Sequence, residues 1–496
     1  MAVMRVLRIG VLVAVVFAAS GCGATEKQAG SVPAGAEFAP ASAAVYISGV
    51  TDPGSSQWEK ADKLLGRFPG REKLLASARK DLKKDGLSWE RDVKPSLGDE
   101  LSLVVLNFED PDHNYVFFTK PKDEAKFNKL LEAGDDPQVH RKVDGWTVFA
   151  DNKASLDNFE EARSAGDPLS DKDAFREAME SVSDDAVLRG YVSGESLYAL
   201  INKEAASDPD ARPFQRFSQS FGTLESLSFS TTAEDEGVAL AATYTSKDQA
   251  KVGSFSPRLD DKLPAGALLY VSFGNLEDFF SEALASADKS FSEFKKQRAR
   301  IEQAMGFSLK EDLFPLFSRE GAVAVYHATE LKVGVMLLLD VKGDEDRARN
   351  VVTRLGALLQ LGEQGKVTKL RINGVEVSHL SFGGQPFELF VAVSDDVLIA
   401  DSTEFGIRDL LGGGTKLVDD PVYNQAREAS GAPDDTIGFI YANLEEGLPY
   451  VFDLMELSSG ERNPDALANT KPLQSALLYA KRDGNRTTAS GFLTIK

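Results

Sequence analysis

Cys22 is the only cysteine in the 496-residue sequence, and the residues before it resemble those at a lipoprotein processing site. Two arginines in the first eight residues supply a basic start, an apolar run covers 9–19, and Ser20-Gly21 precede the thiol. A secretory signal peptide has this order of basic, apolar and small residues. Lipidation needs a thiol that forms a thioether with diacylglycerol and then becomes the new N-terminus. We therefore predict that 1–21 is a lipoprotein signal peptide and that Cys22 carries the lipid.

Two alternatives for this segment stay open. Ala19 stands where leucine is most often found, so a plain secretory signal with an incidental cysteine is the first alternative. An uncleaved anchor helix is the second, and it is disfavoured because the eleven residues of 9–19 fall short of the roughly 20 that span a bilayer. The leading prediction places the protein outside the cytoplasm, attached to the cell membrane through lipid on Cys22. Two or three acyl chains on one cysteine hold firmly, whereas a single chain does not.

The rest of the sequence offers few residues suited to catalysis or metal binding. None of its four histidines is at ligand-like spacing from another: His113, His140, His327 and His379. Nucleophile elbows, phosphate loops, dinucleotide fingerprints and zinc-protease motifs are absent from the sequence. We therefore predict a non-enzymatic protein with no cofactor and no metal site. A hydrolase of unknown type is kept as an alternative, because a pair of catalytic carboxylates meets only in the fold.

Two loops carry clusters of carboxylates, which are the oxygen ligands that Ca²⁺ prefers. One holds Glu109, Asp110 and Asp112, and the other is 344–346. Neither has the alternating aspartates, glycine and distant glutamate of a calcium-binding loop. We expect both to be solvated turns, and whether they bind calcium is left open.

The charge of the chain limits its partners. Once the two arginines of the signal are removed, 54 basic residues remain against 77 acidic ones, a net charge of −23. Such a surface repels nucleic acid and anionic lipid headgroups, so we predict no nucleic-acid partner. A hydrophobic content of 42% is ample for large packed cores.

The chain after the signal divides into a tether and two copies of one module. Small and polar residues dominate 22–39, which favours a flexible tether. The segment 40–48 recurs as 264–272, and further matches keep the same order along the chain. These are Gly86 with Gly306, Asp92 with Asp312, Ala150-Asp151 with Ala400-Asp401, Tyr191 with Tyr441, and Leu224 with Leu473. We assign 40–248 to the first copy and 249–496 to the second.

Each copy is predicted to be an α+β module. Runs rich in β-branched and aromatic residues predict strands, and Asp144-Gly145 and Asn373-Gly374 are typical of tight hairpin turns. The strands of the first copy are expected at 43–50, 101–108, 115–119, 186–192, 224–233 and 237–245, and 142–150 is expected to form two more strands that pair across Asp144-Gly145. Hairpins outnumber crossovers. We therefore expect two homologous modules, each a mainly antiparallel sheet with helices on one face.

The helices follow from apolar residues at helical spacing. Gln57 to Leu82 predicts a helix that is interrupted at Pro69-Gly70. In the second copy 276–305 predicts one long amphipathic helix, whose apolar set should pack on its own sheet. This set comprises Phe279, Phe280, Leu284, Phe291, Phe294 and Ile301. Covering a lipid-sized cavity or a partner groove is the alternative role.

One stretch of the first copy carries a family resemblance. It runs from Gln57-Trp58 through Leu64-Leu65 to Arg67-Phe68-Pro69-Gly70, with Asp92-Val93-Lys94-Pro95 and Leu97-Gly98 further on. These segments resemble domain-of-unknown-function family 3352 of bacterial envelope proteins. The resemblance implies an exported, duplicated protein, but no activity, substrate or catalytic residue.

The sequence therefore predicts a lipid-anchored envelope protein of unknown activity that acts by binding or scaffolding. The first alternative is a carrier or chaperone for a hydrophobic or lipidic envelope component, which the 30 phenylalanines and the 276–305 helix favour. A protein or hydrophobic ligand is the expected partner in either case, besides the membrane that holds Cys22.

Overall fold

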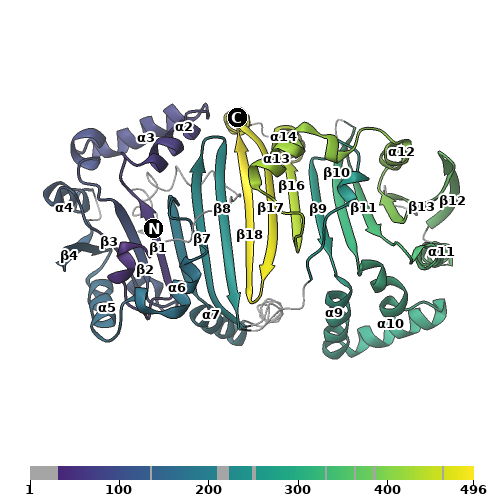
Figure 1. Ribbon diagram of the computed structural model, residues 1–496, viewed down its shortest axis with the longest axis horizontal. Helices are drawn as coiled ribbons and strands as arrows, with labels where there is room; N and C mark the ends of the chain where they lie inside the picture. The colour runs from purple at the N-terminus through teal and green to yellow at the C-terminus, as the bar shows by residue number, and fades with distance from the viewer. Residues whose placement is uncertain are drawn as a thin grey trace. The chain divides into compact units, whose positions relative to one another are not determined.

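The structure is a computed structural model that describes residues 32–134, 137–208, 223–247, 253–329, 332–361, 365–383, 387–460 and 463–496. The chain folds into two compact units. The first holds the described residues up to 247 together with 464–474 and 482–496, and the second holds those of 253–463 and 475–481. Both combine antiparallel strands with helices, which confirms the predicted α+β class (Figure 1).

The described part of the first unit contains a nine-stranded antiparallel sheet in the order β4-β5-β3-β2-β1-β6-β7-β8-β18. Its strands are β1 (Val45–Val50), β2 (Glu100–Val105), β3 (Tyr115–Thr119), β4 (Val139–Val143), β5 (Trp146–Ala150), β6 (Leu188–Ser193), β7 (Leu224–Glu234), β8 (Gly237–Ser246) and β18 (Arg486–Ile495). The helices are α2 (Ser56–Leu65), α3 (Arg71–Lys84), α4 (Glu124–Glu132), α5 (Lys153–Ser164), α6 (Asp173–Met179), α7 (Gly194–Ser207) and α15 (Pro464–Thr470). The interruption predicted at Pro69-Gly70 is confirmed, since it separates α2 from α3.

In the second unit the described strands pair antiparallel in the order β12-β13-β14-β15-β11-β10-β9-β16-β17. They are β9 (Leu269–Gly274), β10 (Glu320–Thr329), β11 (Lys332–Asp340), β12 (Gly365–Ile372), β13 (Val375–Phe382), β14 (Glu388–Ser394), β15 (Val397–Asp401), β16 (Gly438–Asn443) and β17 (Leu473–Asp483). The helices are α9 (Glu277–Ser290), α10 (Ser292–Met305), α11 (Glu345–Leu361), α12 (Glu404–Gly412), α13 (Pro421–Ser430) and α14 (Leu444–Ser459).

Corresponding strands have the same neighbours in the two sheets. In the first unit β1 lies between β2 and β6, and in the second β9 lies between β10 and β16. Each of these central strands carries a fully buried tyrosine, Tyr46 in β1 and Tyr270 in β9. A duplication would produce this correspondence, and the predicted module boundaries remain a prediction.

The predicted hairpin turns have the backbone that their residues favour. Asp144 and Gly145 have φ of 49° and 82°, and Asn373 and Gly374 have φ of 48° and 87°. Positive φ at both central positions is the requirement of the type I′ turn, which aspartate, asparagine and glycine accept most readily. These turns set the pairing of β4 with β5 and of β12 with β13.

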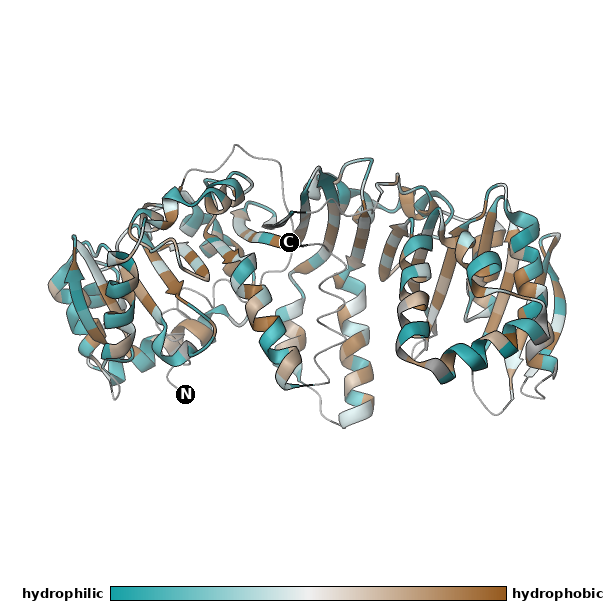
Figure 2. Ribbon diagram, turned by 90° about the horizontal axis from the view of Figure 1, so that it is seen from below, coloured by the Kyte–Doolittle hydropathy of each residue, from teal (hydrophilic) through white to brown (hydrophobic). Residues whose placement is uncertain are grey.

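Helices cover both faces of each sheet, where the sequence predicts helices on one face only. In β14, Phe390 packs into a core with α12 and α13, whereas the next residue, Val391, packs into another core with α11. Phe118 and Phe117 divide in the same way in β3. Successive side chains of a strand point to opposite faces, so strands with apolar residues at adjacent positions need cover on both. In Figure 2 many residues of the strands are brown, the colour of hydrophobic residues.

The predicted helix over 276–305 breaks at Phe291 into α9 and α10. Phe291 has φ of −130° and ψ of 88°, outside the helical region, and serines stand on both sides of it. Serine side chains compete for backbone hydrogen bonds in helix interiors, which favours such a break. Most of the predicted core set is therefore exposed: Phe279 at 49%, Phe291 at 65%, Phe294 at 43% and Ile301 at 52%. The expectation that this set packs on the sheet is wrong for these four residues.

Candidate functional site

Cys22 lies outside the described residues, so lipidation remains a prediction. The described end of the predicted tether is folded instead: Ala34–Glu37 form a 3-10 helix, and Ala36, Phe38 and Ala39 are buried in the core of the first unit. Within the described residues, every helix falls short of the length and apolar character that crossing a membrane requires.

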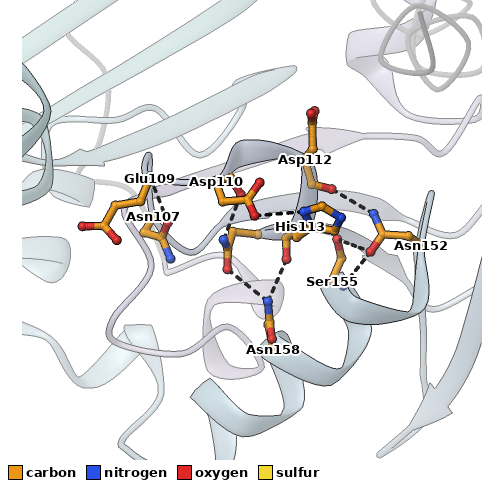
Figure 3. A network of polar contacts seen from close by, with 9 residues as sticks. Asn107, Glu109, Asp110, Asp112, His113, Asn152, Ser155 and Asn158 are labelled. Atoms are coloured by element: carbon orange, nitrogen blue, oxygen red, sulfur yellow. Dashed lines mark hydrogen bonds and ion pairs between the residues drawn. The ribbon is translucent and has the colours of Figure 1, made fainter. Parts of the chain in front are cut away.

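The first acidic loop is held by its own polar groups (Figure 3). Asp110 contacts His113 Nδ1 across 2.9 Å. Asn152, just before α5, donates to the backbone carbonyl of Asp112, and Asn158 within α5 donates to that of His113. The carboxylates of Glu109 and Asp112 point away from each other (Figure 3). The loop is therefore a braced turn, and its carboxylates do not converge on one point.

The second acidic loop caps α11. Glu345 accepts the Gly343 N–H across 2.9 Å, which holds the pKa of the carboxyl below its ordinary value. Asp344 and Asp346 pair with arginines one turn further along the helix. Carboxylates at a helix N-terminus are stabilised by the helix dipole. Neither loop brings three metal-ligating side chains together, and no such group occurs in the described ranges.

The histidines lie on separate elements. His327 on β10 meets the ring of Tyr450 edge-on at 4.9 Å between centroids, and His379 on β13 stacks on Phe390 at 4.4 Å. His140 lies on β4. The structure thus gives His327 and His379 packing partners.

A buried carboxylate latch that the sequence did not predict stands at the start of β10. Glu320, which is 7% exposed, accepts the backbone N–H groups of Arg258 and Leu259 and the hydroxyl of Ser272, at 2.8 to 3.2 Å. In the first unit Glu100 stands at the start of β2 and accepts the Gly35 N–H at 3.2 Å. Each glutamate thus ties the segment before the first strand of its unit to the sheet.

Two more acidic side chains are buried in the second unit. Asp260 is 3% exposed and accepts hydrogen bonds from the Tyr423 hydroxyl at 2.8 Å and from Arg427 at 3.2 Å. Asp401 is 1% exposed and accepts the N–H and hydroxyl of Thr403. Burial raises the pKa of Glu320 to about 7 and that of Asp401 to about 6, and it raises the pKa of Asp260. Perturbed carboxyls of this kind occur in active sites and in structural networks alike. Each of these three carboxyls is held by hydrogen bonds from residues of its own unit.

The most unusual surface is the second half of α14. Its first half is held by Tyr450, which is 6% exposed and packs on His327. Leu454 and Leu457 follow Tyr450 by four and seven residues, so all three share one helix face. Yet Leu454 is 39% and Leu457 is 63% exposed. The buried face of α14 therefore continues as an apolar surface without cover from the described residues.

Further apolar residues widen this surface. Val451 and Met455 are 47% and 55% exposed. All the charged residues of α14 are acidic. These four exposed residues, Val451, Leu454, Met455 and Leu457, are called the α14 patch below.

The Arg67-Phe68-Pro69-Gly70 segment, which carries much of the resemblance noted above, makes hydrogen bonds to residues that lie far from it in the sequence. The Arg67 guanidinium donates to the carbonyls of Asp235, at 2.6 Å, and of Ile495, the last residue of β18. Gly70 donates its N–H to Asn469 in α15 at 2.7 Å. A Cβ at position 70 would lie 2.6 Å from Asn469 Oδ1, so a larger residue would displace that side chain. The segment thus holds α15 and β18 to the first unit.

A family model described as "Protein of unknown function (DUF3352)" matches residues 1–446. The chain belongs to this family. No curated protein matches the DUF3352 chain in sequence. Among solved structures, crystal form IV of TP0453 is 11% identical with a TM-score of 0.25, covering 49% of this chain and 94% of that one. Crystal form III is 10% identical with a TM-score of 0.24, covering 49% and 95%. Likeness at this level supports no conclusion.

The sequence thus singled out Arg67-Phe68-Pro69-Gly70 but did not predict the contacts that these residues make. It also missed the Glu320 latch and the α14 patch. The pairing of Glu100 with Glu320 was available, because the offset that aligns Gly86 with Gly306 also aligns these two glutamates. The α14 patch had no comparable signal, since an apolar helix face in sequence normally indicates a core contact.

Proposed function

We propose that this DUF3352 protein is a lipid-anchored, extracytoplasmic binding protein without enzymatic activity, which holds a hydrophobic partner on the α14 patch. The signal sequence and Cys22 support the location. The α14 patch supports the activity, and it is the observation that carries the proposal. A helix face that is packed at Tyr450 and exposed at Leu454 and Leu457 is typical of a surface that a partner completes.

The charges of α14 limit the class of partner that can bind there. Glu445, Glu446, Asp453 and Glu456 line a helix without Lys or Arg. An anionic lipid headgroup would be repelled by these groups, whereas a basic segment would be attracted. The partner is thus an amphipathic protein segment with apolar anchors and lysine or arginine beside them. Such a segment would lay its apolar face along α14 in the helix-in-groove manner.

The test measures binding of two fluorescent amphipathic helical peptides with the same apolar face, one lysine-rich and one glutamate-rich, to the chain from Gly23 to Lys496. We expect the lysine-rich peptide to bind more tightly, and V451S/L454S/L457S to weaken it by at least about tenfold, because several apolar contacts are lost. The matched control is F291S/F294S/I301S, which removes as many exposed apolar groups from another surface. Equal binding by both variants would refute the role of α14.

Native mass spectrometry of the purified chain separates this proposal from the carrier alternative. A co-purifying lipid or small molecule would favour the carrier. An unliganded mass, together with binding of the basic peptide, would favour the protein partner.

A further inference from the structure

α10 is displayed rather than packed. Arg298 links α10 to α9: it donates to Asp288 of α9 at 2.6 Å and also pairs with Glu302 of α10. All three side chains are only 16–17% exposed. Glu302 in turn accepts the Leu309 N–H at 3.0 Å. The contacts that Arg298 and Glu302 make are therefore polar, and Phe294 and Ile301, which lie beside Arg298 on the helix, stay exposed.

These apolar residues form an exposed stripe. Phe294 and Ile301 are seven residues apart, two turns of helix, and Phe291 lies at the break just before α10. The three are 65%, 43% and 52% exposed in the order Phe291, Phe294 and Ile301. Along a helix roughly 21 Å long, the stripe could rest on a flat surface over its whole length.

Basic residues flank the stripe. Lys295 follows Phe294 and Arg300 precedes Ile301, so they project roughly 100° to either side of it. Lys296, further round the helix, pairs with Glu293 at 2.8 Å. Glu293 and Glu302 are the acidic residues of α10 against four basic ones. Four basic and two acidic residues give α10 a net charge of +2, whereas the chain as a whole carries −21. Exposed phenylalanines with lysine and arginine beside them are the arrangement of helices that lie in a membrane interface.

We infer that α10 docks on the surface of an anionic lipid bilayer, with Phe291, Phe294 and Ile301 among the lipid headgroups and acyl chains. Lys295 and Arg300 would extend along the interface to the anionic headgroups. The charge of α10 favours a bilayer of this sign, whereas the acidic α14 disfavours it. The inference concerns a second surface and extends the proposed function only in that the lipid on Cys22 would keep α10 near a membrane.

The experiment uses the unlipidated chain from Gly23 to Lys496, so that Cys22 contributes nothing. Flotation with phosphatidylcholine vesicles, with and without about 30 mol% phosphatidylglycerol, measures the bound fraction. We expect anionic vesicles to bind at least about tenfold more tightly than neutral ones, and salt of about 0.5 M to reduce the difference. F291S/F294S/I301S should lose at least about tenfold in affinity for anionic vesicles, since each apolar side chain adds to insertion.

Two further variants make the result specific. K295Q/K296Q/R300Q should abolish the preference for anionic vesicles, and V451S/L454S/L457S should bind as the wild type does. Circular dichroism checks that each variant is folded. Equal affinity of the wild type for both vesicle types, no binding at all, or equal losses from the α10 and α14 variants would overturn the inference. Peptide binding to α14 is measured without vesicles, so the two proposals fail independently.

Discussion

Tyr423 donates its hydroxyl proton to the buried carboxylate of Asp260 across 2.8 Å, and the two residues are 163 positions apart in the chain. Tyr441 lies beside Tyr423, at 5.0 Å between ring centroids, but its buried hydroxyl contacts no hydrogen-bond partner in the described residues. The same core thus contains one tyrosine that satisfies a carboxylate and one that does not.

Tyr423→Phe should destabilise the second unit by about 1–3 kcal/mol, because Asp260 loses a donor in a place that water does not reach. Tyr441→Phe is the matched control, and it should leave stability unchanged or raise it slightly, since an unsatisfied polar atom is removed. Urea unfolding measures the free energy of unfolding of both variants, and an unchanged m-value shows that only stability has changed. Equal losses in the two variants would show that the hydrogen bond to Asp260 contributes nothing.

Stability should fall as the pH rises from about 4.5 to about 7. Burial raises the pKa of Glu320 from 4.5 to about 7, so between these values the folded chain binds a proton that the unfolded chain has lost. The stabilisation is complete below 4.5 and is lost as the pH passes 7. Asp401, raised from 3.8 to about 6, acts in the same direction.

Glu320→Gln should reduce this pH dependence by about 2 kcal/mol between pH 5 and pH 8, in urea unfolding curves recorded at both values. Glu428→Gln on the exposed side of α13 is the control and should leave the slope as it is. A slope that survives in Glu320→Gln would assign the titration to other groups.

Arg67→Ala should loosen the end of β18, because two backbone carbonyls lose a charged donor. We expect amide exchange of the last residues of β18 to quicken by about fivefold, equivalent to about 1 kcal/mol. Lys63→Ala, on the exposed side of α2, serves as the comparison. Unaltered exchange in Arg67→Ala would mean that strand pairing alone holds β18.

Cys22→Ser should abolish incorporation of labelled fatty acid and release the protein from the membrane fraction of its host. The reason is that serine lacks the thiol to which the diacylglycerol would be attached. Continued labelling of the variant would contradict lipidation at this position.

Local features were predictable from the sequence because their causes are local. The Asp144-Gly145 turn follows from the φ that these residues accept, and the gap between α2 and α3 follows from Pro69-Gly70. The prediction that the apolar residues of 276–305 pack on the sheet was wrong, because apolar spacing does not reveal whether a surface is there to pack against. Phe294 and Ile301 have the spacing of core residues and are exposed.

Long-range features were out of reach for a different reason. Glu320 is one of 77 acidic residues, and only the fold shows that two backbone N–H groups point at it. The partners of Arg67 and Gly70 are likewise far away in the chain, so a motif of this kind marks a place without naming its contacts.

The pairing of β18 with β8 has a consequence for biosynthesis. Residues 486–494 complete the hydrogen bonding of 237–245, although the sequence of the second unit lies between them. A chain that is exported from its N-terminus presents β8 long before β18 arrives, and an unpaired edge strand is a template for aggregation. In such a chain the sheet of the first unit is complete only once 486–494 have emerged. A product that terminates before 486 would lack β18, and the open edge of β8 would make it recognisable to proteases and chaperones.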